Sequence, residues 1–163
     1  MGQKGRGTHV WYERGVRPRG PVDQRFAFTY MFAAVRPGSD DAFALVLPEV
    51  NTAAMQVFLD RFAASLDPKV HVILLLDRAG WHVTKRLQVP PTLTLVFLPP
   101  YAPELNPVER IWLFLRERFL SHRVFANLRA VMRGCCEAWR QLCRETGRLA
   151  SLTNYPYLRK VRI

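Results

Sequence analysis

Two acidic residues of this chain stand where a buried framework could present them to a ligand. Asp77 follows residues 70–76, a continuous apolar run typical of a β-strand covered on both faces. Glu109 follows Asn106 and Pro107 at the start of an amphipathic segment that predicts a helix. In open α/β sheets ligands gather beyond the carboxyl ends of strands, so Asp77 would reach such a crevice. Two carboxylates gathered in this way are what a divalent-metal site for phosphoryl transfer needs.

Each carboxylate also has a purely structural interpretation. An aspartate at a strand end often caps the turn that follows it. With Asn106 as N-cap, Pro107 at the first helical position and Glu109 at the third, the helix start has a capping-box pattern. By position alone the two interpretations of Asp77 are balanced, and Glu109 favours the cap.

The surrounding pattern predicts an α/β domain. β-Branched and aromatic runs bounded by turn residues predict strands at 25–35, 42–47, 70–76 and 93–98. Apolar residues at helical spacing predict a helix capped by Asn51 or Thr52, a short helix at 84–89, and longer helices from Asn106 and from Asn127 to Arg144. Helices on either side of the strand at 70–76 imply crossover connections and a partly parallel sheet. Residues 1–25 indicate a loop with a short hairpin, and residues 152–163 show no assignable pattern.

The net charge of +11 is unevenly distributed along the chain. Residues 26–109, which contain both carboxylates, hold six basic and eight acidic side chains, whereas residues 110–144 hold eight and two. Twenty of the 24 basic residues are arginine, whose planar fork suits phosphate oxygens. This layout favours a cation-holding site beside a surface that binds nucleic acid. Coding bias and solubility are the alternative explanation of the arginine content.

The length of 163 residues suits one domain, and the apolar runs are too short to span a membrane. The N-terminal residues have no secretory h-region. Cys135, Cys136 and Cys143 lack metal-ligand spacing and lie in a helical pattern, which indicates reduced thiols in a cytoplasmic protein.

The strings LLLDRAGWH and LVFLPPYAPELNPVERIW resemble the catalytic domain of DDE transposases, in particular the mariner superfamily and its bacterial insertion-sequence relatives. The resemblance extends over nearly the whole chain. It implies a ribonuclease-H-like mixed sheet flanked by helices over residues 1–150, followed by a basic tail at 151–163. It also implies that Asp77 and Glu109, 32 positions apart, are the second and third catalytic carboxylates, with His82 in an accessory role.

The resemblance further implies a function and its partners. The carboxylates would hold Mg²⁺, or Mn²⁺ in its place, for cleavage and transfer of DNA strands during transposition. The partners would be transposon ends and target DNA, with a homo-oligomer as the active complex, bound to the nucleoid of a bacterial cytoplasm. Basic residues near the site would contact the DNA backbone: Arg6, Arg17, Arg19, Arg78, Lys85, Arg110, Arg116, Arg118 and Arg123.

The chain departs from the family pattern at its start. The first catalytic aspartate of the family lies on a central strand upstream of the match to residues 2–7, and Asp23, Asp40 and Asp41 do not replace it. We therefore expect a sheet that lacks this strand and leaves two strand edges unpaired. The chain would be inactive alone, and three interpretations stay open. It is a fragment of a longer transposase that arises from truncation, a frameshifted second reading frame or a misplaced start, and an upstream reading frame would then encode its N-terminal part. Otherwise it is a decayed remnant, or a non-catalytic DNA-binding regulator of transposition.

Overall fold

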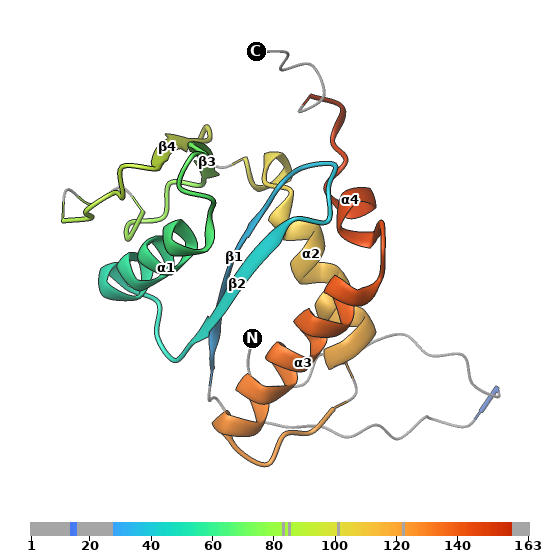
Figure 1. Ribbon diagram of the computed structural model, residues 1–163. Helices are drawn as coiled ribbons and strands as arrows, with labels where there is room; N and C mark the ends of the chain where they lie inside the picture. The colour runs from blue at the N-terminus through green and yellow to red at the C-terminus, as the bar shows by residue number, and fades with distance from the viewer. Residues whose placement is uncertain are drawn as a thin grey trace.

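The centre of the molecule is an antiparallel hairpin of β1 (Tyr30–Val35) and β2 (Ala42–Leu47), shown in Figure 1. The computed structural model describes residues 14–15, 28–82, 84, 86–100, 102–121 and 123–157. The register runs from Tyr30 opposite Leu47 to Val35 opposite Ala42. The predicted second strand is confirmed at 42–47. The first is confirmed from Tyr30 onward, while residues 25–27 lie outside the described part of the chain.

A second, parallel pair consists of β3 (Val72–Leu76) and β4 (Leu93–Phe97). Helix α1 (Thr52–Ser65) leads into it from the hairpin. The Asn51 side chain accepts a hydrogen bond from the Ala54 amide at 2.8 Å, which confirms Asn51 as the N-cap. The parallel direction of β3 and β4 confirms the partly parallel pairing expected from the sequence.

The C-terminal half is helical and begins with η1 (Pro103–Leu105) and α2 (Val108–Leu115). A π-helical segment, η2 (Arg116–Leu120), continues α2. Helix α3 (Leu128–Arg144) begins at Asn127, whose side chain accepts from the Ala130 amide at 2.9 Å. A short helix, α4 (Arg148–Leu152), was not anticipated from the sequence. Its first turn depends on Asp40, which accepts hydrogen bonds from the Gly147 and Ala150 amides across 107 and 110 positions.

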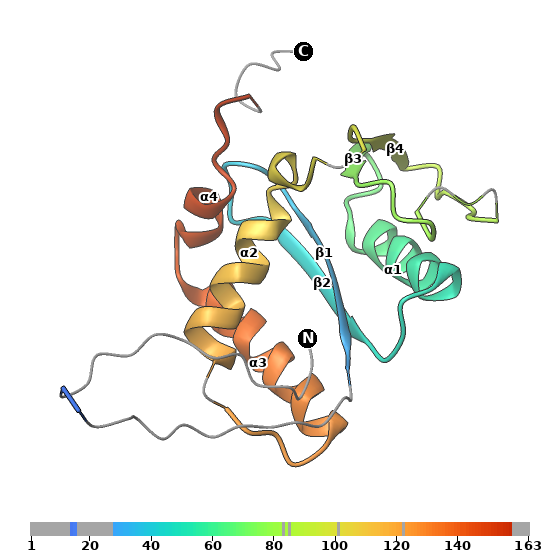
Figure 2. The same cartoon turned by 180° about the vertical axis from the view of Figure 1, so that it is seen from behind.

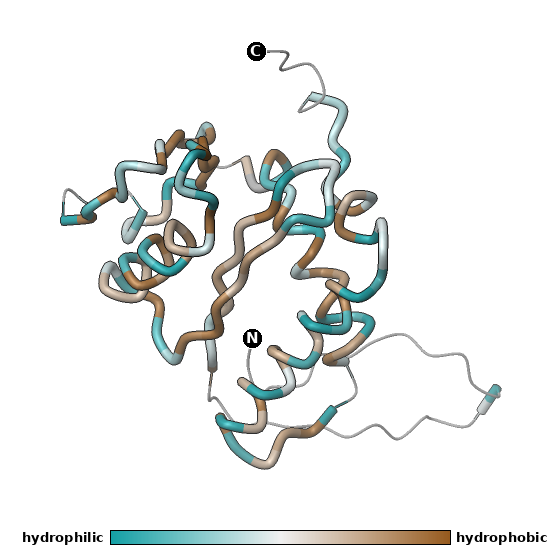
Figure 3. Tube along the Cα trace, viewed as in Figure 1, coloured by the Kyte–Doolittle hydropathy of each residue, from teal (hydrophilic) through white to brown (hydrophobic). Residues whose placement is uncertain are grey.

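The hairpin is covered on both faces, as Figures 1 and 2 show. On one face Phe32, Ala34 and Phe43 pack with α1 and the β3–β4 pair. On the other face Met31 and Val35 pack with α2, α3 and α4 around the buried residues Ile111, Leu115, Ala138, Leu142 and Leu149. Figure 3 shows the resulting predominance of apolar residues along both hairpin strands. Alternation along each strand thus fills two separate cores. No helix among the described residues is long and apolar enough to cross a membrane.

The predicted helix at 84–89 is wrong, because no helix occurs among the described residues of that segment. Gln88 instead exchanges two hydrogen bonds with the side chain of Gln56 on α1, each 2.8 Å long. Six residues give a marginal helix at best, so these two tertiary bonds decide the local conformation.

The two strand pairs are not joined into one sheet among the described residues. β1 pairs only with β2, and β3 only with β4, so one edge of β1 and one edge of β3 lack a described partner. β3 is also not covered on both faces as predicted. None of its five aliphatic side chains is fully buried, and Ile73 is 54% exposed. Val72, Leu74 and Leu76 pack against the core, whereas Ile73 projects from the opposite face of the strand pair, which is not covered by a helix in the described part of the chain.

Candidate active site in the cleft between β1 and β3

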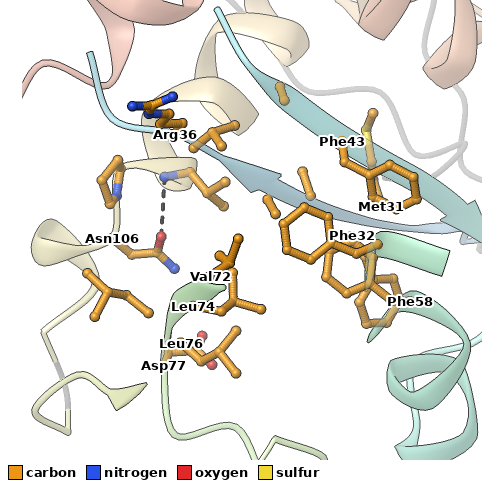
Figure 4. A pocket seen from close by; sticks show the side chains of 18 of the residues that line it. Met31, Phe32, Arg36, Phe43, Phe58, Val72, Leu74, Leu76, Asp77 and Asn106 are labelled. Atoms are coloured by element: carbon orange, nitrogen blue, oxygen red, sulfur yellow. Dashed lines mark hydrogen bonds between the residues drawn. The ribbon is translucent and has the colours of Figure 1, made fainter. Parts of the chain in front are cut away.

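A cleft of about 1350 Å³ lies between the unpaired edges of β1 and β3. Its walls are mostly apolar, and Figure 4 shows side chains from both sides, among them Phe32, Phe43, Phe58, Val72, Leu74 and Leu76. Asp77, His82, Asn106, Glu109 and Arg116 also line it. The structure therefore brings the two predicted carboxylates and the predicted accessory histidine to one cavity.

Asp77 directly follows β3, and its side chain is 54% exposed. Its Oδ1 accepts a hydrogen bond from the Ala79 amide at 3.2 Å, so the turn-capping interpretation describes a real contact. The same oxygen lies 2.6 Å from His82 Nδ1. Within the described residues Oδ2 accepts no hydrogen bond, which leaves one carboxylate oxygen available to a ligand.

His82 holds the Asp77 carboxylate in place. Its side chain is only 14% exposed, and its Nδ1 also lies 3.2 Å from the Asp77 carbonyl oxygen. Because an ionised carboxylate only accepts hydrogen bonds, Nδ1 carries the proton in the contact with Oδ1. The structure thus places His82 as a partner of Asp77 rather than as an isolated group.

Glu109 stands in the first turn of α2 and is exposed. Asn106 Oδ1 accepts from the Val108 amide at 3.2 Å, a bond drawn in Figure 4, so Asn106 caps this helix start. The second half of the expected capping box is wrong, because the Glu109 carboxylate makes no return bond to the Asn106 amide among the described contacts. The carboxylate of Glu109 therefore takes no part in capping the helix among the described contacts.

The pKa of Glu109 reports its surroundings. Partial burial raises this pKa above the ordinary value of 4.5, the Asp77 carboxylate raises it further, and the Arg116 guanidinium lowers it. The effect of Asp77 agrees with the position of both carboxylates along the same cleft. Arg116 lies seven residues after Glu109, two helical turns along the same face.

The other basic residues named from the sequence have varied positions. Arg78 lies at the tip of β3 and donates to the Leu98 carbonyl at 3.2 Å, and Arg110 covers the Tyr155 ring at 4.8 Å. Arg118 pairs with Glu145 at 3.4 Å, and Arg123 approaches Glu137 at 3.9 Å. Only Arg116 of these lines the cleft. Four of them lie outside the described residues: Arg6, Arg17, Arg19 and Lys85.

Sequence reasoning missed the support that the C-terminal segment gives to the site. The Tyr157 hydroxyl donates to the Leu105 carbonyl just before α2, across 52 positions. Arg110, in the first turn of α2, stacks on Tyr155 of the same segment. The sequence near Tyr155 and Tyr157 does not predict these contacts, because tyrosines also occur in solvent-exposed tails.

Glu109 and Asp77 remain a pair in the part of the chain that the structure describes. No group of three His, Cys, Asp or Glu side chains is gathered there closely enough to hold a metal ion. Asp40 is engaged in capping α4, and Asp41 pairs with Arg36 at 3.4 Å, so neither adds to the pair, as expected.

Comparison with known proteins places this chain in a family. A family model described as DDE superfamily endonuclease matches residues 1–132. The chain is 44% identical over 125 residues to the uncharacterized protein y4pE/y4sA of Sinorhizobium fredii (strain NBRC 101917 / NGR234), which covers 77% of this chain and 93% of that protein.

A solved structure shares the fold. The crystal structure of the Mos1 strand transfer complex matches with a TM-score of 0.51 and 17% identity over 93% of this chain. The match covers 51% of the Mos1 chain, so the present chain spans about half of that length. The architecture is ribonuclease-H-like, as the sequence predicted. With the family match extending over most of its residues, the chain belongs to the DDE superfamily of endonucleases.

Proposed function

We propose that this chain carries the DNA-cleaving and strand-transferring site of an insertion-sequence transposase, and that the site uses Mg²⁺ or Mn²⁺. The observation that carries the proposal is the convergence of Asp77 and Glu109 on one cleft, from a strand tip and a first helical turn. Membership of the DDE superfamily supports an endonuclease reaction. The fold shared with a chain of the Mos1 strand transfer complex is consistent with it.

The donor chemistry of the pair fits a hard divalent cation. Asp77 keeps one oxygen free of described hydrogen bonds, and Glu109 is repelled by Asp77, a cost that a shared cation would relieve. Mg²⁺ commonly binds through one or two carboxylates, with waters and substrate phosphates completing its shell. When bound, such a cation supplies charge stabilisation to phosphoryl transfer.

The contribution of the protein is positioning. His82 fixes the orientation of Asp77, and the Asn106 cap fixes the start of the helix that carries Glu109. Arg116 on the cleft wall and Arg78 at the strand tip would hold phosphate oxygens of the DNA backbone. Such preorganised charge is the main requirement of phosphoryl transfer, in which little covalent chemistry is asked of the protein.

The gap between β1 and β3 is the place for a third carboxylate. A strand inserted there would satisfy two unpaired edges and cover the exposed aliphatic side chains of β3. We propose that this strand carries the first catalytic aspartate and comes from the N-terminal part of the transposase, encoded in an upstream reading frame. Active complexes would then be homo-oligomers on DNA in a bacterial cytoplasm.

A plasmid-nicking assay tests this function. The 163-residue chain with Mg²⁺ should leave supercoiled DNA intact, because two carboxylates do not complete the site. A longer chain that supplies an aspartate-bearing strand ahead of residue 1 should nick the plasmid, and Asp77→Asn in that longer chain should abolish nicking. Nicking by the 163-residue chain that depends on Asp77 would show that the third carboxylate had been misplaced.

A non-catalytic DNA-binding regulator of transposition is the second candidate. The observation in its favour is that the described residues gather only two acidic ligands while residues 110–144 carry eight basic side chains. Failure of every extended chain to nick DNA, together with retained DNA binding, would decide for this role.

A further inference from the structure

Four arginines form one exposed line along α3: Arg129, Arg133, Arg140 and Arg144, which we call the α3 ridge. Their spacing of four, seven and four residues keeps them within about 60° of one another around the helix axis. The opposite face is buried in the protein through Val131, Cys135, Ala138 and Leu142. The ridge therefore points away from the core over its whole length, roughly 22 Å at the helical rise.

The ridge arginines have no described intramolecular partner, in contrast to Arg118, Arg123 and Arg148. Arg118 and Arg148 pair with Glu145 and lie near the Phe114 ring, and Arg123 pairs with Glu137. Glu137 is the one acidic residue near the ridge, and its described partner is Arg123 rather than a ridge arginine. Within the described residues the four guanidinium groups are thus available to a ligand.

The helix accepts an electrostatic cost to present them. Arg133 stands four residues, about one helical turn, after Arg129, and Arg144 stands four residues after Arg140. Like charges four residues apart disfavour a helix. Arg129 also stands in a first turn that contains no acidic residue, where the helix dipole disfavours a cation. The four guanidinium groups therefore concentrate positive charge at both ends of the exposed face of α3, with Glu137 between Arg133 and Arg140.

From this arrangement we propose that the α3 ridge binds the phosphate backbone of duplex DNA. The inference rests on the proposed function for its choice of polyanion. Arginine forks match phosphate oxygens, and the ridge is about as long as six base-pair steps of one strand. α3 lies across the β1–β2 hairpin from the β3–β4 pair (Figures 1 and 2) and packs against α2, the helix that carries Glu109. The ridge is a second, sequence-independent contact.

Two charge-matched variants test the ridge. One replaces Arg129, Arg133 and Arg140 with glutamine. The control variant replaces Arg61, Lys69 and Arg86 with glutamine. These three residues are exposed, do not line the cleft and have no described ion pair. Binding of a fluorescent 20-base-pair duplex is measured between 50 and 200 mM KCl, with circular dichroism as the check on folding.

The ridge variant should lose at least tenfold in affinity at 50 mM KCl, and its salt slope should flatten by about 2.7, since each lost phosphate contact removes about 0.9. The control variant should bind within twofold of the parent chain. Equal weakening of both variants, or unchanged binding by the ridge variant, would overturn the proposal. If the triple variant does not fold, Arg133→Gln alone should flatten the slope by about 0.9.

Two further readouts separate the possible failures. A polyglutamate peptide that displaced the duplex at equal charge would overturn the assignment to DNA in favour of an acidic protein partner. Mn²⁺ binding should be intact in the ridge variant and lost in Asp77→Asn. If the parent chain binds DNA but does not bind Mn²⁺, the proposed function is refuted and the ridge proposal stands.

Discussion

The Asp77 carboxylate combines a structural contact with a proposed chemical role. One oxygen accepts from the Ala79 amide and from His82, and the other is left to the cleft. Glu109 differs from Asp77 in that its carboxylate does not accept the expected hydrogen bond from the Asn106 amide among the described contacts. The negative charge of Asp77 also raises the pKa of Glu109. At Asp77 the capping contact leaves one oxygen open, and at Glu109 the return bond is absent from the described contacts, so the metal-ligand roles of both residues stay predictions.

Glu109→Gln should make the protein more heat-stable at pH 7. The folded pKa of Glu109 lies above its ordinary value, so the folded state binds the proton more tightly than the unfolded chain. Stability therefore decreases as pH rises from about 4.5 through the raised pKa, and glutamine removes this decrease. Melting curves from pH 4 to 8 should show a gap between parent and variant that closes on acidification.

Glu104→Gln is the matched control for this titration. Glu104 is exposed in η1, five residues before Glu109. The account would be contradicted if Glu104→Gln reproduced the pH-dependent gap, or if Glu109→Gln melted lower than the parent at pH 7.

At the scale of elements, α3 depends on a close contact between a glycine and a ring. A Cβ added at Gly134 would lie 2.6 Å from Phe125 Cε1, well inside contact distance. This glycine lets the segment before α3 fold back over the helix, and Phe125, Val131 and Cys135 form a small core there. The helix face at this position is therefore fixed by packing rather than by propensity.

Overpacking at Gly134→Ala should cost about 1–3 kcal/mol of unfolding free energy. Because alanine is favoured over glycine in a helix by roughly 1 kcal/mol, we expect a net destabilisation at the lower end of this range or below it. Denaturant titration measures the difference, and Phe125→Leu should recover part of it. Gly80→Ala is the control, because its added Cβ meets nothing within 4 Å. A Gly134→Ala variant more stable than the Gly80→Ala variant would contradict the packing argument.

Elements with a strong local signal were predicted from the sequence, and those held by distant contacts were not. Asn51 and Asn127 predict the starts of α1 and α3, because each capping side chain lies within a few residues of an apolar stripe at helical spacing. α4 depends on Asp40, 107 positions before Gly147, and residues 84–89 are held by Gln56 on α1. The approach of Asp77 to Glu109 came from the family resemblance, since neither residue alone excludes a capping role.

At the scale of the whole molecule, the open gap between β1 and β3 has a physical cost. Both strands present an edge without a described partner, and the aliphatic side chains of β3 remain partly exposed. An exposed apolar edge is a template for pairing with another chain. The same feature that prepares the cleft for an incoming strand thus makes the chain prone to self-association.

Ile73→Lys should reduce that self-association. Ile73 is 54% exposed on β3 and lines the cleft, so a lysine there adds charge beside the open edge without emptying the core. Sedimentation velocity over a concentration series should show less association than in the parent chain. Val96→Lys, at a 42% exposed position on β4 outside the cleft, is the control. An equal effect of both lysines would assign the association to general surface hydrophobicity.

The central claim is that Asp77 and Glu109 form one divalent-cation site. Its most direct test is Mn²⁺ binding, followed by electron paramagnetic resonance, in the parent chain and in Asp77→Asn, Glu109→Gln and Glu104→Gln. The account predicts that the parent and Glu104→Gln bind alike, and that Asp77→Asn and Glu109→Gln each lose about tenfold or more, equivalent to about 1.4 kcal/mol. Equal binding by all four proteins would contradict a shared site in the cleft.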